Sequence, residues 1–288
     1  MLNTDFILRS MELSDIGDAM KLSGAEGWNQ TERDWKRLIE NPGNICKAAE
    51  LENKIIGTAT TMNYSNRVAW IGMVLVDKEF RGKGVSKALL THLFGELKDC
   101  KSVKLDATSE GRKVYEKLDF RDEYSIVRMT NPSLKELSLA EDEEISPGPV
   151  QLKQLQQVIA LDRLIFGADR TRLIESLVKE YPDKLRLLER NNLVAGFALG
   201  RDGSKYHQIG PVMASSVMDA KMLIGGALKN LVNRQVVVDV LCDKKEMISW
   251  LNTLGFIEQR RFIRMYKGRN PFPGITGKQY LICGPEFG

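Results

Sequence analysis

The sequence predicts a mixed α/β protein built from two successive domains. Segments that alternate or are continuously apolar, as in strands, are interspersed with segments whose apolar residues recur at helical spacing. The chain has 288 residues, which exceeds the usual size of one domain. The second half also repeats in part the order of elements in the first, and a duplicated fold is the economical explanation.

The first half is expected to follow the order β-α-α-β-β-β-α-β-α-β. Ser14 is a plausible N-cap for the first helix, and Thr31 and Asp34 mark the start of the second. The segment 68–76 is more continuously apolar than the other strands, so we expect it near the centre of the sheet. We expect strands at 6–11, 45–51, 54–64, 68–76, 102–108 and 124–130, and helices at 14–22, 31–39, 86–99 and 110–118.

The second half is separated from the first by a proline-containing, acidic segment with little periodicity. We therefore predict domains at 1–131 and 150–288, joined by a linker at 132–149. "VYEKLDF" (114–120) and "WLNTLGF" (250–256) occupy equivalent places, each after a strand and before an expected final hairpin. In the second half we expect helices at 151–166, 169–181, 216–231 and 246–254, and strands at 184–190, 193–200, 206–214, 235–242 and 262–268.

Composition excludes several classes of protein. No run of about 18 apolar residues occurs, and the start "MLNTDFILRS" lacks the features of a signal peptide, so we expect a cytoplasmic protein that does not cross a membrane. Residues 151–288 hold 21 Lys and Arg against 13 Asp and Glu. This excess is thinly spread without interleaved aromatic residues, so nucleic acid is an unlikely partner. We expect no metal site, because no CxxC spacing or nearby histidine accompanies Cys46, Cys100, Cys242 and Cys283.

The segment "VLVDKEFRGKGVSKALLTHLF" (74–94) carries the clearest chemical signal. It runs from an apolar strand, through a loop with two glycines and several cations, into a helix. Unpaired amides and the dipole at a helix N-terminus favour phosphate or pyrophosphate, and Gly82 and Gly84 permit close backbone approach. The spacing does not fit GxxxxGK[ST], and Lys87 stands where the third glycine of GxGxxG would be.

The same segment resembles motif A of the GNAT superfamily of N-acetyltransferases, Q/R-x-x-G-x-G/A after a central strand. Arg81, Gly84 and Ser86 occupy its fixed places, with Ser86 departing from the usual Gly or Ala. The resemblance covers residues 5–130 and implies acetyl-CoA as the donor, with the strands beside Val76 and Leu105 splayed apart to admit it. It implies that the backbone of Val74, Leu75 and Val76 pairs with the pantetheine arm. The pyrophosphate would then lie on Arg81, Gly82, Lys83, Gly84, Val85, Ser86 and Lys87.

Tyr115 occupies the place where the family has a tyrosine near the sulfur of CoA. A phenol is protonated at neutral pH, so Tyr115 is the predicted general acid for the leaving thiolate. Thr108 stands where many relatives have Asn, as a possible cofactor contact. The base is left open between a water chain, Glu12 and Glu26, because Trp70 replaces the glutamate that several relatives have on the central strand.

The acceptor site is expected near "EGWNQTERDW" (26–35), where the superfamily commonly builds it. Trp28, Asn29 and Gln30 could contact substrate by stacking and amide hydrogen bonds; an aromatic staple with a polar turn is the alternative. Asp169, with Asp162 and Arg170, offers further recognition charges, which could equally be ordinary helix-surface charges.

The second half lacks the motif. No Gly-x-Gly follows "YHQIGPVM", and Leu251 stands opposite Tyr115. Together with "IFGADRTRLIESL" and "YLICGPEFG", this resembles a bacterial group of tandem GNAT proteins with a degenerate C-terminal domain. The resemblance implies acetyl transfer to a small amine, an amino acid or a peptide N-terminus. The alternative is a non-catalytic acyl-CoA-binding sensor, and the oligomeric state is left open.

Overall fold

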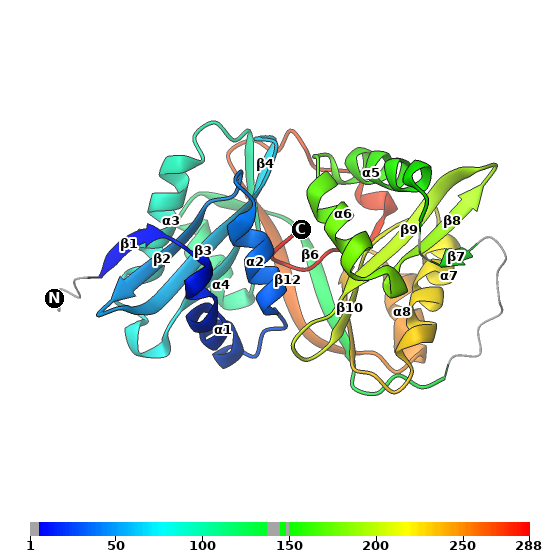
Figure 1. Ribbon diagram of the computed structural model, residues 1–288, viewed down its shortest axis with the longest axis horizontal. Coiled ribbons are helices and arrows are strands. Elements are labelled where there is room, and N and C mark those ends of the chain that lie inside the picture. Colours follow the sequence, from blue (N-terminus) through cyan, green and yellow to red (C-terminus); the bar gives the residue numbers. More distant parts are fainter. Residues whose placement is uncertain (1–5, 137–144, 148–149) are drawn as a thin grey trace.

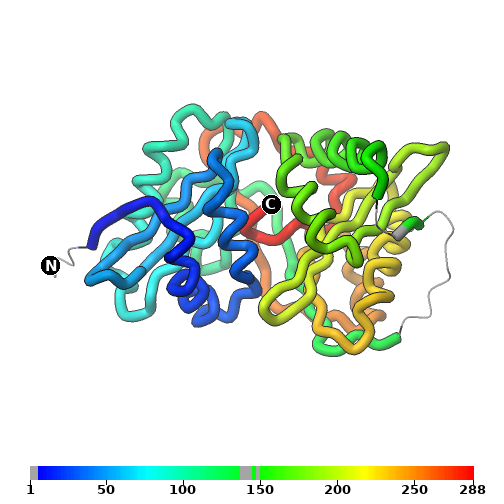
Figure 2. Tube along the Cα trace, viewed as in Figure 1, coloured from blue at the N-terminus to red at the C-terminus, as the bar shows by residue number. Residues whose placement is uncertain are grey.

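The computed structural model describes residues 6–136, 145–147 and 150–288 (Figure 1). Most of the predicted linker at 132–149 therefore lies outside the described residues, but Ile145–Pro147 forms a short strand, β7. The protein has two lobes, and the segment that ends at Gly288 lies between them (Figure 2).

The elements of the first half follow the predicted order. The helices are α1 (Ile16–Ala25), α2 (Glu32–Glu40), α3 (Val85–Glu96) and α4 (Ser109–Glu116). The strands are β1 (Ile7–Ser10), β2 (Cys46–Leu51), β3 (Lys54–Tyr64), β4 (Val68–Val76), β5 (Ser102–Ala107) and β6 (Phe120–Asn131). Thr31 caps α2 as predicted, because its hydroxyl accepts from the Asp34 amide and Asp34 accepts from the Thr31 amide. Ser14, in contrast, lies within a short 3-10 helix, Leu13–Asp15, that precedes α1.

The second half repeats this pattern with different lengths. Its helices are α5 (Leu152–Phe166), α6 (Thr171–Glu180), α7 (Val217–Leu228) and α8 (Lys245–Thr253). Its strands are β8 (Arg186–Arg190), β9 (Leu193–Arg201), β10 (His207–Met213), β11 (Val236–Leu241), β12 (Ile257–Lys267) and β13 (Gln279–Leu281). The sequence analysis missed β7 and β13, which are only three residues long, and began β6 and β12 several residues late.

The main departure from expectation is an exchange of strands between the halves. All the strands form one sheet, in the order β1-β2-β3-β4-β5-β12-β6-β11-β13-β10-β9-β8-β7. The expected final hairpin of each half is absent: β12 is inserted between β5 and β6, and β6 pairs in turn with β11. The second half therefore supplies a strand to the sheet beside the candidate site of the first.

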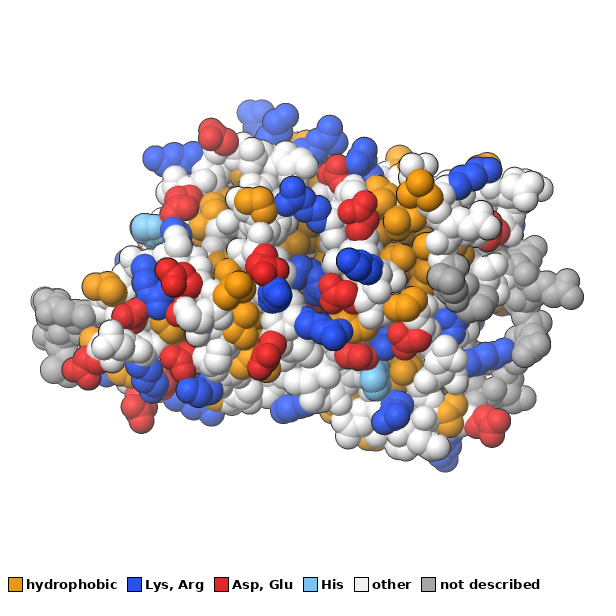
Figure 3. Space-filling model, in the orientation of Figure 1, with side chains coloured by type: hydrophobic (Ala, Val, Ile, Leu, Met, Phe, Trp, Pro, Cys, Tyr) orange, Lys and Arg blue, Asp and Glu red, His pale blue; other side chains and the backbone are white. Residues whose placement is uncertain are grey.

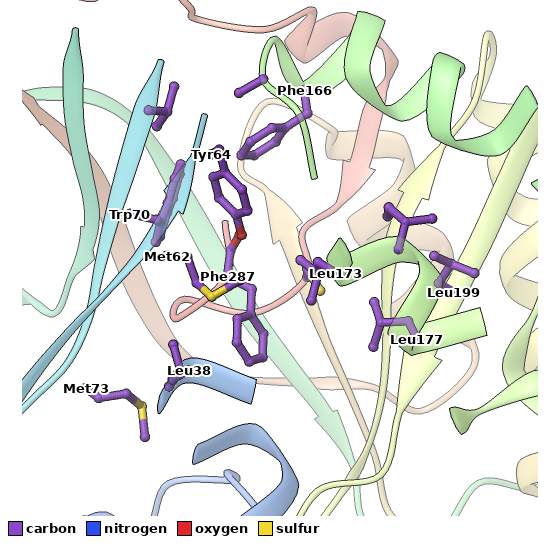
Figure 4. Packing of buried hydrophobic residues seen from close by; sticks show 14 of the residues in the cluster. Leu38, Met62, Tyr64, Trp70, Met73, Phe166, Leu173, Leu177, Leu199 and Phe287 are labelled. Atoms are coloured by element: carbon purple, nitrogen blue, oxygen red, sulfur yellow. The ribbon is translucent and has the colours of Figure 1, made fainter. Parts of the chain in front are cut away.

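The helices cover the sheet and seal the junction between the lobes. Val85, Leu89 and Leu93 of α3 pack on β2 and β3, and α7 and α8 pack on the strands of the second half. One buried cluster joins α1 and α2 to α5 and α6, with Trp70 and Phe287 within it (Figure 4). On the face shown in Figure 3, positive and negative side chains are interspersed. No helix within the described ranges is long and apolar enough to cross a membrane.

Candidate active site

Strands β4 and β5, the fourth and fifth strands from the β1 edge of the sheet, separate along part of their length. They pair in parallel only from Val68–Ile71 to Ser102–Leu105. Met73 has a left-handed backbone, with φ at 51°, where the register between β3 and β4 also shifts. A bulge of this kind bends one strand away from its neighbour. The remainder of β4, including Val74, Leu75 and Val76, therefore has no partner on β5. The two strands diverge there, as the resemblance to the GNAT superfamily implies.

The glycine loop leads from this divergence into α3. Gly82 and Gly84 have φ values of 74° and 85°, and a side chain at either position would extend into open space. Gly84 is the N-cap of α3 and has no side chain with which to cap it. The amides of Val85, Ser86 and Lys87 belong to the first turn, where N–H groups have no intrahelical acceptor. The loop therefore presents backbone donors at the positive end of a helix dipole.

The cations of the loop are only partly available to a ligand. The Arg81 guanidinium donates to Glu26 Oε1 over 2.5 Å and to the Val76 carbonyl over 3.3 Å. Lys83 Nζ lies 4.7 Å from the centre of the Phe80 ring, and Lys87 is exposed. Glu26 forms this ion pair with Arg81 and lies outside the cavity described next, so the structure does not support Glu26 as the base.

A cavity of about 160 Å³ lies where β4 and β5 diverge. Its wall combines residues from distant parts of the chain: Trp28, Gln30, Ile71, Gly72, Met73, Val74, Leu105, Asp106, Ala107, Thr108, Gly111, Tyr115, Arg128, Arg260, Phe262, Pro285 and Glu286. Four of these, from Arg260 to Glu286, belong to the second half. The structure therefore brings Tyr115, Thr108, Val74, Trp28 and Gln30 to the wall of one cavity.

Tyr115 lies on α4 with its ring against Phe120, the ring centroids 5.8 Å apart. Gly111, one turn earlier on the helix, leaves room for the ring, because a β-carbon there would lie 3.3 Å from it. Burial raises the pKa of Tyr115 to about 12, so its hydroxyl is protonated at neutral pH. The Thr108 hydroxyl accepts from the Gly111 amide over 3.1 Å and caps α4, which gives this residue a structural function.

The segment Gly284–Gly288 closes one side of the cavity. Trp70 Nε1 donates to the Pro285 carbonyl over 3.0 Å, and the Tyr64 hydroxyl donates to the Phe287 carbonyl over 2.6 Å. Figure 4 shows Phe287 among Tyr64, Met62 and Leu38. Gly72 permits the close approach of the segment, since a β-carbon there would lie 3.0 Å from the Glu286 Cα. Trp70, at the place where the resemblance implies a glutamate in several family members, therefore helps to position Glu286 beside β4.

A buried polar network connects this segment to both halves. Arg201 donates to Glu286 Oε1, to Asp34 Oδ2 over 2.7 Å and to Gln208 Oε1 over 2.8 Å. Asp34, Arg201 and Glu286 have at most 2% of their surface exposed. Burial raises the pKa of Glu286, and the Arg201 charge opposes that shift. Glu286 Oε2 is buried without a hydrogen-bond partner among the residues that the structure describes.

Asn29 and Asp169 do not line the cavity. The Asn29 side chain accepts from the Lys205 and Tyr206 amides and donates to the Tyr206 carbonyl, so it binds the two halves together. Asp169 pairs with Arg163 and accepts from the Thr171 amide at the start of α6.

Asp162, Arg170 and Glu12, the other charged residues predicted near the site, also have structural functions. Asp162 and Arg170 form a buried ion pair, and Arg170 also donates to the Gly288 carbonyl over 2.7 Å. They anchor the segment Gly284–Gly288 instead of recognising a ligand. The exposed Glu12 caps a 3-10 helix and is not in the cavity wall, so it is not placed to act as the base.

Arg260, Pro285 and Glu286 were missed by sequence reasoning. They lie more than 140 residues after Tyr115, and no local motif connects them to it. The available signals were indirect: Trp70, at the place where the resemblance implies an acidic residue, and the glycine and proline of "YLICGPEFG", which mark a non-helical segment.

The helix of the second half that corresponds to α3 is capped by its own side chains. Ser216 is the N-cap of α7 and accepts from the Asp219 amide over 3.1 Å. Leu251, opposite Tyr115 in the internal alignment, is fully buried. The first turn of α7 therefore lacks the open glycine cap found at α3.

A divergent strand pair, a helix N-terminus at its end and a cavity between them are consistent with the fold of a GNAT-type transferase. Two family models agree with this class: residues 14–120 match the acetyltransferase (GNAT) family, and residues 158–281 match an acetyltransferase (GNAT) domain. The chain belongs to the GNAT superfamily and contains two GNAT domains in tandem. Members of this family generally use acetyl-CoA.

Two relatives of this chain are named as acyltransferases. The chain is 22% identical to "Uncharacterized N-acetyltransferase YitH" of Bacillus subtilis over 73% of each sequence. It is 24% identical to "Holothin acyltransferase" of a Pseudoalteromonas species, over 92% of this chain and 88% of that protein. A crystal structure from Pyrococcus horikoshii, 24% identical, superimposes with a TM-score of 0.81 over 100% of this chain and 98% of the other, which shows the shared fold.

Proposed function

We propose that this protein is an acetyl-CoA-dependent N-acetyltransferase that acts on a primary amine by direct transfer, with Tyr115 as the general acid. The observation that carries the proposal is the cavity at the divergence of β4 and β5, which has Tyr115 in its wall and lies beyond an open glycine loop. Residues 1–131 would hold the donor. The second domain, whose helix α7 is capped by its own side chains, would complete the acceptor site without binding acetyl-CoA itself.

The donor would bind along β4 and at the start of α3. The backbone of Val74, Leu75 and Val76 is free on the β5 side to pair with the pantetheine arm. The residues from Gly82 to Lys87 fit a pyrophosphate, because the two glycines leave open space and the first-turn amides lack acceptors. When bound, acetyl-CoA supplies the activated thioester carbonyl.

Transfer forms a bond between the amine nitrogen and the acetyl carbon and breaks the bond from that carbon to sulfur. A backbone N–H on the 74–76 strand would stabilise the developing oxyanion. Tyr115 would donate its phenolic proton to the leaving sulfur. Glu286 would accept the proton from the amine, because Asp106, the other carboxylate in the wall, already accepts two hydrogen bonds from Arg264.

The test is an acceptor screen by thiol release from acetyl-CoA. We expect release with at least one class of primary amine. Gly84→Val should raise the Kd of acetyl-CoA at least about tenfold, because a β-branched residue is strained at positive φ and covers the first-turn amides. Gly95→Ala in the same helix is the matched control and should bind normally. Acetyl-CoA binding without thiol release for any amine would favour the sensor instead.

Glu286→Gln tests the base. In the wild type, kcat/KM should fall as the pH drops through the raised pKa of Glu286, because only the carboxylate accepts a proton. The pH profile of the Gln variant should lack this acidic limb. Its kcat/KM at neutral pH should fall only about tenfold, because water can accept the proton from the amine instead. Asp34→Asn also removes a carboxylate from Arg201 but lies outside the cavity wall, so it should keep the limb. An acidic limb that persists in Glu286→Gln would rule out this role.

A further inference from the structure

Arg260 is a half-buried cation in the cavity wall without a counter-ion. No hydrogen bond or ion pair from within residues 6–136, 145–147 and 150–288 reaches its guanidinium. The other charged groups in the wall are compensated: Arg128 donates two hydrogen bonds to Asp239, Asp106 pairs with Arg264, and Glu286 pairs with Arg201. The cavity therefore carries one uncompensated positive charge.

The strand exchange creates this imbalance. Arg260 on β12 is the register partner of Arg128 on β6, and Arg128 is the register partner of Asp239 on β11. Two cations thus face one carboxylate across three adjacent strands, and Arg128 donates to both oxygens of that carboxylate. Like charges on directly opposite residues destabilise a sheet. Burial and the Arg128 charge lower the pKa of Arg260, and the charges of Asp239, Glu110 and Glu26, none of which forms an ion pair with Arg260 in the described ranges, oppose this shift only in part.

A bulge directs Arg260 toward the cavity. The register of β12 shifts between Glu258 and Arg260, so one extra residue, Gln259, interrupts the alternation. After the bulge, Arg260 and Phe262 both line the cavity. Arg261, next to Arg260, is exposed and forms an ion pair with Glu258 instead. A half-buried, uncompensated guanidinium is stabilised when a ligand brings a negative charge, and its planar fork matches a carboxylate.

We propose that Arg260 binds the carboxylate of the acceptor, so that the amine acetylated is that of a free amino acid. This inference rests on the proposed function and names the substrate class of the same site. The cavity volume of about 160 Å³ suits a small molecule. Phosphates of the donor are the other source of negative charge. The loop that fits them is at the start of α3, whereas Arg260 shares the cavity with Tyr115.

The experiment compares matched acceptors that differ only in the carboxylate. L-Alanine, L-phenylalanine, L-leucine, L-lysine and L-glutamate are tested with their α-amides and their decarboxylated amines. Three quantities are measured: thiol release with acetyl-CoA, the Kd of acetyl-CoA, and calorimetric binding of each acceptor to protein saturated with CoA. For at least one set, the wild type should bind the amino acid about tenfold or more tightly than the amide.

Arg260→Gln should reduce that preference by about 10- to 100-fold, the usual range for a hydrogen bond to a charged group. Arg260→Lys should keep part of the preference for the carboxylate, because lysine retains the positive charge but lacks the planar guanidinium. Arg261→Gln removes a neighbouring charge outside the cavity and should leave the preference unchanged.

Three results would overturn the inference: equal binding of acids and amides by the wild type, no binding of any acid, or an unchanged preference in Arg260→Gln. A raised Kd for acetyl-CoA with an unchanged preference would assign Arg260 to the donor. The failure of the proposed function is separate, because it would appear as carboxylate-selective binding without thiol release.

Discussion

Replacing Arg201 by Met is expected to lower the free energy of unfolding by about 3–5 kcal/mol, the usual cost of leaving buried charges unpaired. Arg201 is fully buried and donates to Asp34, Gln208 and Glu286. A Met side chain fills much of the same volume but cannot compensate the carboxylate of Glu286, whereas Asp34 keeps its ion pair with Arg37. Urea unfolding followed by tryptophan fluorescence measures the change.

The loss should also depend on pH. Burial already raises the pKa of Glu286, and removing the Arg201 charge that opposes this shift raises it further. A carboxyl whose pKa is higher in the folded state penalises folding fully above that pKa. The penalty disappears as the pH falls below the pKa of the unfolded chain. The cost of Arg201→Met should therefore be smaller at about pH 5 than at about pH 8.

Arg172→Met is the control for this experiment. Arg172 is an exposed arginine that donates to Asn41 across the same junction between the lobes. Its replacement should change the stability by less than about 0.5 kcal/mol. An equally small effect of Arg201→Met, or a cost that does not vary with pH, would contradict the interpretation of the network as the connection between the two domains.

Tyr115→Phe is expected to lower kcat by about 100-fold, at the lower end of the range for general acid catalysis, with an unchanged Kd for acetyl-CoA. The phenyl ring keeps the contact with Phe120, so only the proton donor is lost. Steady-state kinetics by thiol release and direct binding of acetyl-CoA measure the two quantities. Tyr266→Phe, on β12 but outside the cavity wall, is the control and should retain normal kcat.

The pH profile provides a second measurement for Tyr115. A general acid is active while protonated, so its contribution disappears as the pH rises through its pKa, which burial raises to about 12. Tyr115 should therefore cause no alkaline decline in kcat below about pH 10. Near-normal kcat in Tyr115→Phe would contradict the assignment as general acid. A decline in the wild type below about pH 10 that disappears in Tyr115→Phe would instead contradict the raised pKa of Tyr115.

Local features of the fold were predictable because short-range chemistry determines them. The capping box of Thr31 and Asp34 is contained in four residues, and the structure forms it. The glycine loop from Arg81 to Lys87 lies between a strand and a helix, and its positive φ values occur at Gly82 and Gly84. The position of Tyr115 could be predicted because its helix, α4, directly follows β5.

Non-local pairing was not predictable in the same way. The expected hairpins at the end of each half are replaced by β6 and β12, which pair with each other across the lobes. A strand carries the same alternation whether its partner is near or far in sequence, so the pattern of β12 does not specify β5 as its neighbour. The bulge at Met73 also lacks a glycine that would have marked its positive φ.

The protein class, the glycine loop and the candidate acid could be predicted from the sequence, because each depends on residues within one turn or one strand of each other. The surroundings of these residues could not. The packed chain places Glu286 beside β4, next to Trp70, and brings Arg260 into the cavity on an exchanged strand. Burial and charge compensation depend on the whole chain, and these contacts join segments separated by more than 100 residues.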